Sequence, residues 1–395
     1  MFSSRLPAAL EPNDFTRILQ AKKAAGAKIL DLTQSNPTHA GFSYDFLQRD
    51  GICTRIRGRY EPSAQGMQSA REAIGRYYLE NGHGRIAGDD LFLTASTSEA
   101  YSFLLKLLTE PGDEVLLPAP SYPLFDFLAN LESVTPVRYA LQLEESGHWR
   151  IDFKSLEMMI SSLTRAIVVV SPNNPTGSYM TAEELSLLNQ LCTTHEIALI
   201  VDEVFLDYIK SGSLKKTFSA ISNNDALTFT LSGFSKILAL PQAKLSWIHV
   251  GGPEPIKEGA KHRLEFIADT YLSVSSMIQQ ATAPLLGVQQ DIQQQILARI
   301  EVNERALKSW TDLEHCPDTC HREGGWYAIL ELPGEITDEE CCLELLEQHS
   351  LIVHPGFFYD FAENNRIVIS LICPEKEFGQ GLAILQGYLD SRSPK

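Results

Sequence analysis

Residues 165–177 read RAIVVVSPNNPTG, an unbroken apolar run that ends in a loop with two prolines and a glycine. Helices cover both faces of a parallel sheet, so its strands are apolar throughout instead of alternating with polar residues. A second apolar run occupies 197–202. Between the two runs, 181–194 begins with Thr181 and carries Glu184 three positions later, the pattern of a helix capping box. The stretch therefore predicts two buried strands joined by a helix.

Strand-like and helix-like segments alternate on both sides of this unit. We expect further strands at 90–94, 114–118, 227–231 and 245–250, and helices at 98–108 and 122–131. Continuous apolar strands separated by helices predict an α/β fold, in which helices sandwich a mostly parallel sheet.

The pattern changes after Gly252. A long helical region covers 255–313, and short strand-like runs follow at 326–330 and 366–371, with helices between and after them. This pattern indicates a smaller α+β domain, to which the N-terminal segment also contributes. We expect two domains, a large one at 46–285 and a small one that combines 1–45 with 286–395.

Composition restricts the class of protein. With 395 residues and 44% hydrophobic content, the chain can build a large core. Its formal net charge of −17 argues against nucleic acid or an anionic membrane as a partner. Residues 1–15 contain no signal-peptide core, and no apolar run approaches the roughly 20 residues of a membrane span. We therefore expect a soluble cytoplasmic protein.

The cysteines raise the question of a metal site. The chain has seven, an odd number that is typical of reduced thiols in a protein without a signal peptide. Residues 315–321 read HCPDTCH and contain the residue types of a zinc site. They lack a second ligand pair at a standard spacing, so we interpret them as a polar loop and expect no metal.

Polar side chains follow three of the predicted strands at the points where the strands end. Asn174 lies in the rigid loop after the first strand, Asp202 ends the second, and Lys236 closes the stretch LSGFSK at 231–236. Ligands of such sheets bind at the carboxyl ends of the strands. A buried Asp202 needs a partner, either in a structural ion pair or in a heteroaromatic cation. A buried Lys236 has a lowered pKa, which makes its amine a nucleophile.

The stretch TASTSE at 94–99 leads directly from a strand into a helix. Small hydroxyl residues at a helix N-terminus present N–H and O–H donors to an anion, and the helix dipole favours the negative charge. The alternative is an ordinary Ser or Thr helix cap.

With these features in this order, the chain resembles the class I/II aminotransferases, the fold-type I pyridoxal-phosphate (PLP) enzymes, over essentially its whole length. The resemblance implies the PLP-dependent transferase fold, with a mostly parallel sheet of the seven-stranded type and PLP bound in the large domain. It implies that Lys236 forms the Schiff base with PLP, that Asp202 pairs with the pyridinium nitrogen, and that Asn174 holds the phenolic oxygen. The cofactor-binding residues that it implies are Tyr60, Ser96, Thr97, Ser98, Tyr122, Asn174, Asp202, Ser235, Lys236 and Lys244.

The resemblance also implies roles in binding substrate and a partner subunit. Tyr60 resembles the tyrosine that reaches the phosphate of the neighbouring subunit, which implies a homodimer. Arg366, in the stretch NRIVIS, resembles the arginine that clamps the substrate α-carboxylate, a task that suits the planar guanidinium. The stretch DLTQSNP at 31–37 resembles the substrate-side segment of the family.

Three positions depart from the family pattern. Phe205 replaces the usual tyrosine that donates to the phenolic oxygen, and losing that donor should raise the pKa of the Schiff base. Lys244 replaces an arginine on the phosphate, and Ser96 a frequent glycine.

The sequence thus predicts a PLP-dependent aminotransferase that moves an amino group between an α-amino acid and a 2-oxo acid by a ping-pong mechanism. The catalytic residues would be Lys236, Asp202 and Arg366. A carbon–sulfur lyase or decarboxylase of the same fold would use the same cofactor residues, so it stays an alternative. A regulatory protein built on this fold would need a DNA-binding module, which the negative charge disfavours.

Overall fold

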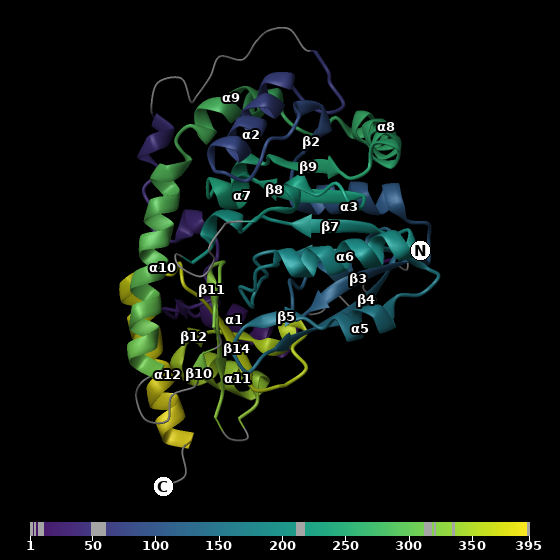
Figure 1. Cartoon of the computed structure of the whole chain (residues 1–395). Helices are drawn as coiled ribbons and strands as arrows, with labels where there is room; N and C mark the ends of the chain where they lie inside the picture. The colour runs from purple at the N-terminus through teal and green to yellow at the C-terminus, as the bar shows by residue number, and fades with distance from the viewer. Residues whose placement is uncertain are drawn as a thin grey trace.

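The computed structural model of the chain describes residues 3, 5–6, 12–48, 61–210, 218–311, 318–319, 321–333 and 336–392. Its centre is an eight-stranded sheet with the strand order β2-β9-β8-β7-β6-β3-β4-β5 (Figure 1). These strands are β2 (Leu91–Thr94), β9 (Ser246–Gly251), β8 (Thr228–Gly233), β7 (Ala198–Asp202), β6 (Thr164–Val170), β3 (Glu114–Ala119), β4 (Thr135–Leu143) and β5 (Trp149–Ile151).

The sheet is mostly parallel, as the sequence predicts. The strands from β8 through β7, β6 and β3 to β4 all pair in parallel. Antiparallel pairs occur at the two sides, where β9 joins β8 to β2 and where β5 pairs with β4. The short strand β5 makes the sheet one strand wider than the seven-stranded type implied by the resemblance.

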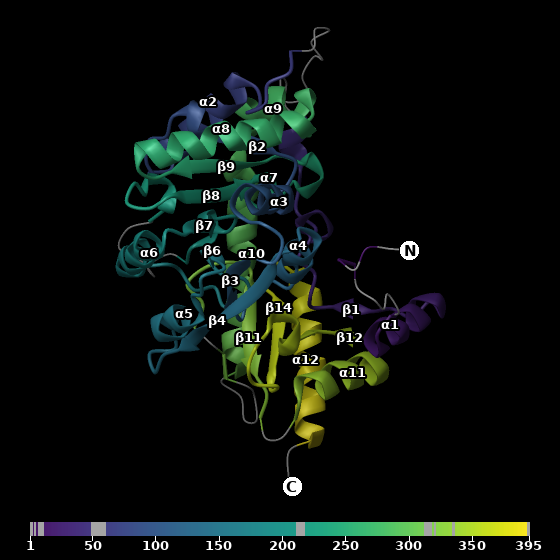
Figure 2. The same ribbon diagram turned by 90° about the vertical axis from the view of Figure 1, so that its right-hand side faces the viewer.

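Both faces of the sheet are covered by helices (Figure 2). On β6, Ile167 and Val169 point into one hydrophobic cluster, and the alternate residues Ala166 and Val168 into another. Helices α3 (Thr97–Leu108), α4 (Phe125–Leu131) and α8 (Glu254–Tyr271) pack against one face, and α5 (Phe153–Met159) and α6 (Ala182–His195) against the other. This two-sided burial is why the strand is apolar at every position from Ala166 to Val170.

The expected helix at 181–194 begins as the sequence pattern predicts. Thr181 is the N-cap of α6, and its side chain accepts a hydrogen bond from the backbone N–H of Glu184. The Glu184 side chain accepts in return from the backbone N–H of Thr181, which completes the capping box.

A smaller part of the molecule is built around a second, antiparallel sheet with the order β10-β11-β14-β13. Its strands are β10 (Asp318–Thr319), β11 (Tyr327–Glu331), β14 (Arg366–Ser370) and β13 (His354–Pro355). The N-terminal segment joins this part, because β1 (Leu30–Asp31) pairs in parallel with β12 (Leu351–Ile352). The helices here are α1 (Asp14–Ala24), α11 (Asp338–His349) and α12 (Glu375–Arg392).

The long α10 (Gln289–Thr311) runs along one side of the molecule, past both sheets (Figure 1). The region expected to be one broken helical stretch is α8, α9 (Ser276–Leu286) and α10. The remaining helices are α2 (Gln68–Glu80) and α7 (Phe234–Ile237). Short 3₁₀ helices lie at Pro37–His39, Asp45–Gln48, Gly88–Asp90, Leu206–Tyr208, Ala220–Ser222, Pro241–Ala243 and Gly356–Tyr359. No helix in the described part of the chain is long and apolar enough to cross a membrane.

Candidate active site

A cavity with about 160 Å³ of open space lies at the carboxyl ends of β6, β7 and β8. Strands that run parallel end at the same edge of the sheet, so the loops that follow them meet there. The residues that line the cavity are Ser35, Thr97, Ser98, Tyr122, Phe125, Val170, Asn174, Asp202, Val204, Phe205, Ser235, Lys236 and Tyr327. The structure therefore brings together seven of the side chains selected from the sequence: Thr97, Ser98, Tyr122, Asn174, Asp202, Ser235 and Lys236.

Lys236 lies in the short helix α7, directly after β8. It is partly accessible through the cavity, yet burial lowers the pKa of its amine, while the charge of Asp202 acts in the opposite direction. Its Nζ lies 5.4 Å from the ring centroid of Phe205 and 5.3 Å from that of Trp326. A lysine amine among aromatic rings, beside a cavity, is set to act as a neutral nucleophile.

The backbone around Lys236 is held from two sides. The hydroxyl of Tyr208 donates to the carbonyl oxygen of Lys236 at 2.7 Å. A Cβ at Gly233 would collide with the side chain of Ser246, so glycine is required where β8 turns into α7 beside β9. These contacts fix the direction in which Lys236 leaves the sheet.

Asp202 is the last residue of β7 and is buried. Its Oδ1 accepts from the backbone N–H of Val204 at 3.1 Å, and its Oδ2 accepts from the hydroxyl of Tyr101, also at 3.1 Å. Burial raises the pKa of Asp202 to about 6, although these two hydrogen bonds and Lys236 lower it. A buried carboxylate of this kind is suited to a cationic partner in the cavity.

Asn174 lies in the loop after β6, and its Oδ1 is buried without a hydrogen-bond partner among the described residues. The neighbouring Asn173 is fully engaged, because it accepts from the Ser121 hydroxyl at 2.9 Å and donates to Pro120 O at 3.0 Å and to Thr176 Oγ1 at 2.9 Å. The loop is therefore rigid, while Asn174 keeps polar capacity free for a ligand.

The stretch TASTSE at the start of α3 has residues in both of the roles expected for it, helix capping and anion binding. Ser96 is the helix N-cap, and its Oγ accepts from the backbone N–H of Glu99 at 3.1 Å. Thr97 and Ser98 line the cavity at the first turn of the helix. The structure thus leaves Ser96 in the ordinary capping role and presents the other two residues to an anion.

Two further residues selected from the sequence, Arg366 and Lys244, are not among the described residues that line the cavity. Arg366 begins β14, and its guanidinium pairs with Glu363 at 2.5 Å and lies 5.3 Å from the ring centroids of Trp149 and Phe361. Lys244 is exposed and is not among the described lining residues. Tyr60 lies outside the described residues, as do His315, Cys316 and Cys320 of the HCPDTCH stretch.

Among the described residues, no group of three or more His, Cys, Asp or Glu side chains is arranged to hold a metal ion. The described cysteines Cys192, Cys341, Cys342 and Cys373 are buried and free. Burial raises the pKa of the Cys192, Cys341 and Cys373 thiols to about 12.

Three residues of the site were missed in the sequence. Tyr101 contacts Asp202 from within α3, and Trp326 and Tyr327 reach the site from the residue before β11 and from its first residue. Their sequence signal is that of core residues, because an aromatic side chain in an apolar helix or strand is most often packing. Ser35 also lines the cavity and belongs to the stretch DLTQSNP.

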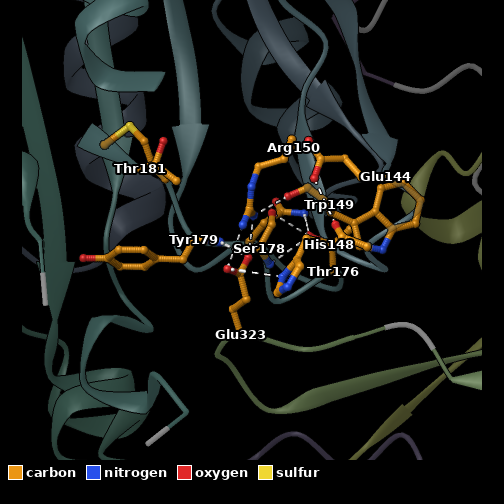
Figure 3. A network of polar contacts seen from close by, with 12 residues as sticks. Glu144, His148, Trp149, Arg150, Thr176, Ser178, Tyr179, Thr181 and Glu323 are labelled. Atoms are coloured by element: carbon orange, nitrogen blue, oxygen red, sulfur yellow. Dashed lines mark hydrogen bonds and ion pairs between the residues drawn. The ribbon is translucent and has the colours of Figure 1, made fainter. Parts of the chain in front are cut away.

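A buried ion pair holds the segment before β11 against the large sheet. Glu323 accepts from Arg150 Nη1 at 2.6 Å and Nη2 at 2.9 Å, and from the backbone N–H of Tyr179 at 3.3 Å. In Figure 3 the Glu323 side chain points toward Arg150 and His148, which belong to β5 and to the turn before it. The pair fixes the position of the segment that leads to Trp326 and Tyr327.

Backbone packing adds to this attachment. Gly177 has a φ of +67°, and a Cβ there would lie 2.5 Å from the carbonyl oxygen of Gly324. The loop that carries Asn174 and the segment that leads to Tyr327 are therefore in direct contact, so neither can shift without the other.

Comparisons with known proteins identify the family of this chain. A sequence model of the family described as aminotransferase class I and II matches residues 55–379. The alanine aminotransferase of Mycobacterium tuberculosis is 29% identical over 377 residues, which cover 93% of this chain and 87% of that protein. The glutamate-pyruvate aminotransferase AlaA of Haemophilus influenzae is 29% identical over 357 residues, covering 87% of this chain and 86% of that protein.

Solved structures share the fold. An alanine aminotransferase from Pyrococcus furiosus has a TM-score of 0.88 at 21% identity, covering 99% of this chain and 100% of that chain. A tyrosine aminotransferase from Leishmania infantum has a TM-score of 0.83 at 18% identity, covering 99% and 100% of the two chains.

Proposed function

This chain belongs to the class I and II aminotransferases, and we propose that the cavity beside Lys236 is its catalytic site. The protein is a PLP-dependent aminotransferase, so it acts on amino acid and 2-oxo acid substrates. The observation that carries the proposal is the meeting of Lys236, Asp202 and Asn174 around one cavity, although they follow three different strands.

The residues present fit PLP. Asp202 is a buried carboxylate with no hydrogen-bonded cation among the described residues, which suits a ring nitrogen that carries a proton. Asn174 lines the cavity, where its side-chain amide N–H can donate to the phenolic oxygen, whereas its buried Oδ1, which has no described partner, can only accept. Thr97 and Ser98, at the first turn of α3, suit the phosphate, and Tyr122 presents an aromatic ring at the cavity edge. When bound, PLP supplies the electron sink for the reaction.

Each residue then has a task that its surroundings support. Burial lowers the pKa of the Lys236 amine, which favours the neutral form in which its Nζ would attach the cofactor and would afterwards accept the proton from the substrate α-carbon. Asp202 stays ionised opposite a positive ring nitrogen, since an opposite charge lowers the pKa of a carboxyl group. The hydroxyl of Tyr101 orients the carboxylate by donating to its Oδ2.

Reduction with borohydride tests the assignment of Lys236. The purified protein with PLP should show a visible band that borohydride fixes, and peptide mapping should place the label on Lys236. Lys236→Ala should abolish the label, whereas Lys106→Ala, at a partly exposed pair with Glu132, should leave it unchanged. A label on a different lysine would contradict the proposed site.

The same preparation separates amine transfer from the lyase alternative. Because the named relatives are alanine and glutamate-pyruvate aminotransferases, we infer that alanine and glutamate are the first amino donors to test, with pyruvate and 2-oxoglutarate as acceptors. Turnover should require an added 2-oxo acid. Release of pyruvate and ammonia without an acceptor would instead support a carbon–sulfur lyase.

We also infer a homodimer, as Tyr60 would have its assigned role only across a subunit interface. Exposed apolar side chains support this inference, since Leu124, Phe127 and Leu131 lie on or next to α4, near the edge of the cavity at Tyr122. Sedimentation of the active enzyme as a monomer would rule out the role of Tyr60.

A further inference from the structure

Phe205 lines the cavity with a ring that has no polar atom. The ring is buried and packs edge-on against Trp326, with the centroids 5.3 Å apart, and against Tyr327, with the centroids 6.2 Å apart. Phe205, three residues after Asp202, therefore contributes packing to this side of the cavity but no hydrogen-bond donor.

Tyr327 provides a hydroxyl next to the same ring. It is the first residue of β11, only 8% exposed, and it lines the cavity together with Asn174 and Ser35. Burial raises the pKa of the Tyr327 hydroxyl, hydrogen bonding by Ser35 and Asn174 acts more weakly to lower it, and all three side chains line the same cavity. Asn174, the residue assigned to the phenolic oxygen of PLP, therefore has a second polar group beside it.

The position of Tyr327 is closely defined by its neighbours. Its backbone lies opposite Ser370 of the neighbouring strand β14. The preceding Trp326 is completely buried, and the segment before it is held by the ion pair of Glu323 with Arg150. A side chain with this support is oriented before any ligand binds, which is what an effective hydrogen-bond donor requires.

We propose that Tyr327 is a cofactor-binding residue that donates a hydrogen bond to the phenolic oxygen held by Asn174. Its hydroxyl thereby supplies the donor that Phe205 lacks. This inference rests on the proposed function, since it requires PLP to occupy the cavity beside Lys236.

The chemistry of the hydroxyl agrees with this role. Burial raises the pKa of Tyr327 to about 12, so the group keeps its proton across the neutral range and remains a donor. A donor to the phenolic oxygen stabilises that oxygen in its anionic form. Removing the donor makes the oxygen more basic, and the nitrogen that links Lys236 to the cofactor then holds its proton to higher pH.

A spectroscopic titration of the PLP-bound enzyme tests the proposal. The visible band of the lysine-bound cofactor would be recorded across pH for the wild type, Tyr327→Phe and Tyr139→Phe. The last variant is the matched control, because it removes an equally buried hydroxyl that donates to the carbonyl oxygen of Val168 at 2.8 Å. We expect Tyr327→Phe to raise the pKa of the band by about 1 to 2 pH units, and Tyr139→Phe to leave it unchanged.

Placing a hydroxyl at position 205 gives two further readouts. In the Tyr327→Phe background, Phe205→Tyr should return the pKa of the band most of the way to the wild-type value. In the wild-type background, where the oxygen already has its donor, Phe205→Tyr should change that pKa by less than about 0.5 pH units. The second readout remains available if Tyr327→Phe does not fold.

Two results would overturn the inference. One is a titration of Tyr327→Phe that coincides with that of the wild type. The other is a fall of about 1 pH unit or more in the pKa of the visible band when Phe205→Tyr is made alone. Failure of the proposed function is distinguishable from both, because the wild-type enzyme would then show no band and no borohydride label on Lys236.

Discussion

Removing the hydroxyl of Tyr101 should destabilise the cofactor-free enzyme by an amount that grows with pH. Tyr101 donates to Asp202 Oδ2 at 3.1 Å, and the other carboxylate oxygen accepts from Val204 N–H, also at 3.1 Å. Burial already raises the pKa of Asp202 to about 6, with both hydrogen bonds acting to lower it. Tyr101→Phe deletes one of these donors and creates no new charge.

The magnitude follows from the strength of such a bond. A hydrogen bond to a charged group contributes about 1.5 to 3 kcal/mol, and one pKa unit corresponds to about 1.4 kcal/mol. The pKa of Asp202 in the folded variant should therefore rise by about 1 to 2 units, to about 7 to 8. In the unfolded chain the group titrates near its ordinary value of about 3.9.

The sign of the pH dependence is set by the raised pKa. An acid with a higher pKa in the folded state than in the unfolded state makes the folded protein less stable as pH rises through the folded pKa. The pH-dependent part of the loss in free energy of unfolding caused by Tyr101→Phe should thus be close to zero near pH 5.5, where Asp202 is mostly protonated. It should reach about 1 to 3 kcal/mol at pH 8.5, where wild-type Asp202 is ionised.

Urea denaturation of the cofactor-free protein between pH 5.5 and 8.5, followed by circular dichroism, measures this dependence. Tyr139→Phe is the control, since its hydroxyl donates to the neutral carbonyl of Val168 and its loss should cost about 0.5 to 1.5 kcal/mol at every pH. The difference between the two variants should widen with pH. A difference that stays flat across this range would refute the reasoning that Tyr101 acts on the ionised form of Asp202.

Two further substitutions test contacts around the site. Glu323→Gln should lower the free energy of unfolding by about 2 to 3 kcal/mol in urea denaturation, because it leaves Arg150 without its buried carboxylate. The control is Glu340→Gln, which breaks a partly exposed pair with Arg392 and should lower the free energy of unfolding by less than about 1 kcal/mol. Equal losses would mean that the buried pair contributes nothing beyond a surface one. Arg366→Gln should raise the KM for the amino donor by about 30-fold or more in steady-state kinetics, because the family resemblance assigns this guanidinium to the substrate α-carboxylate. A change below about 3-fold would show that Arg366 serves only its ion pairs with Glu363 and Glu331.

Much of the large sheet could be predicted from local patterns. The strand at Thr164–Val170 is apolar at nearly every position because both of its faces are buried, and only a helix-covered parallel sheet buries a strand in this way. Asn174, Asp202 and Lys236 follow from the same pattern, as each comes after a strand whose end lies at the common edge.

Arg366 illustrates what such patterns do not contain. Its stretch forms the strand that the sequence predicts, and its role at the substrate carboxylate stays a prediction. The register decides which end of this strand faces the cavity. Tyr327, which lines the cavity, pairs with Ser370, whereas Arg366 pairs with Glu331 at the opposite end of the same strand pair. Register depends on contacts between segments far apart in the chain, so the residues of one strand alone do not reveal it.

The sequence by itself determined the fold class, the family and the three polar groups at the strand ends, because hydrophobic periodicity and chain direction are local properties. Only the tertiary structure decided which neighbours these groups have. It assigned Ser96 to a helix cap, placed Tyr101 against Asp202, and brought Tyr327 from the small sheet to Asn174. Those contacts join residues that are far apart in the chain, and each depends on how helices and sheets pack, a property that no single segment carries.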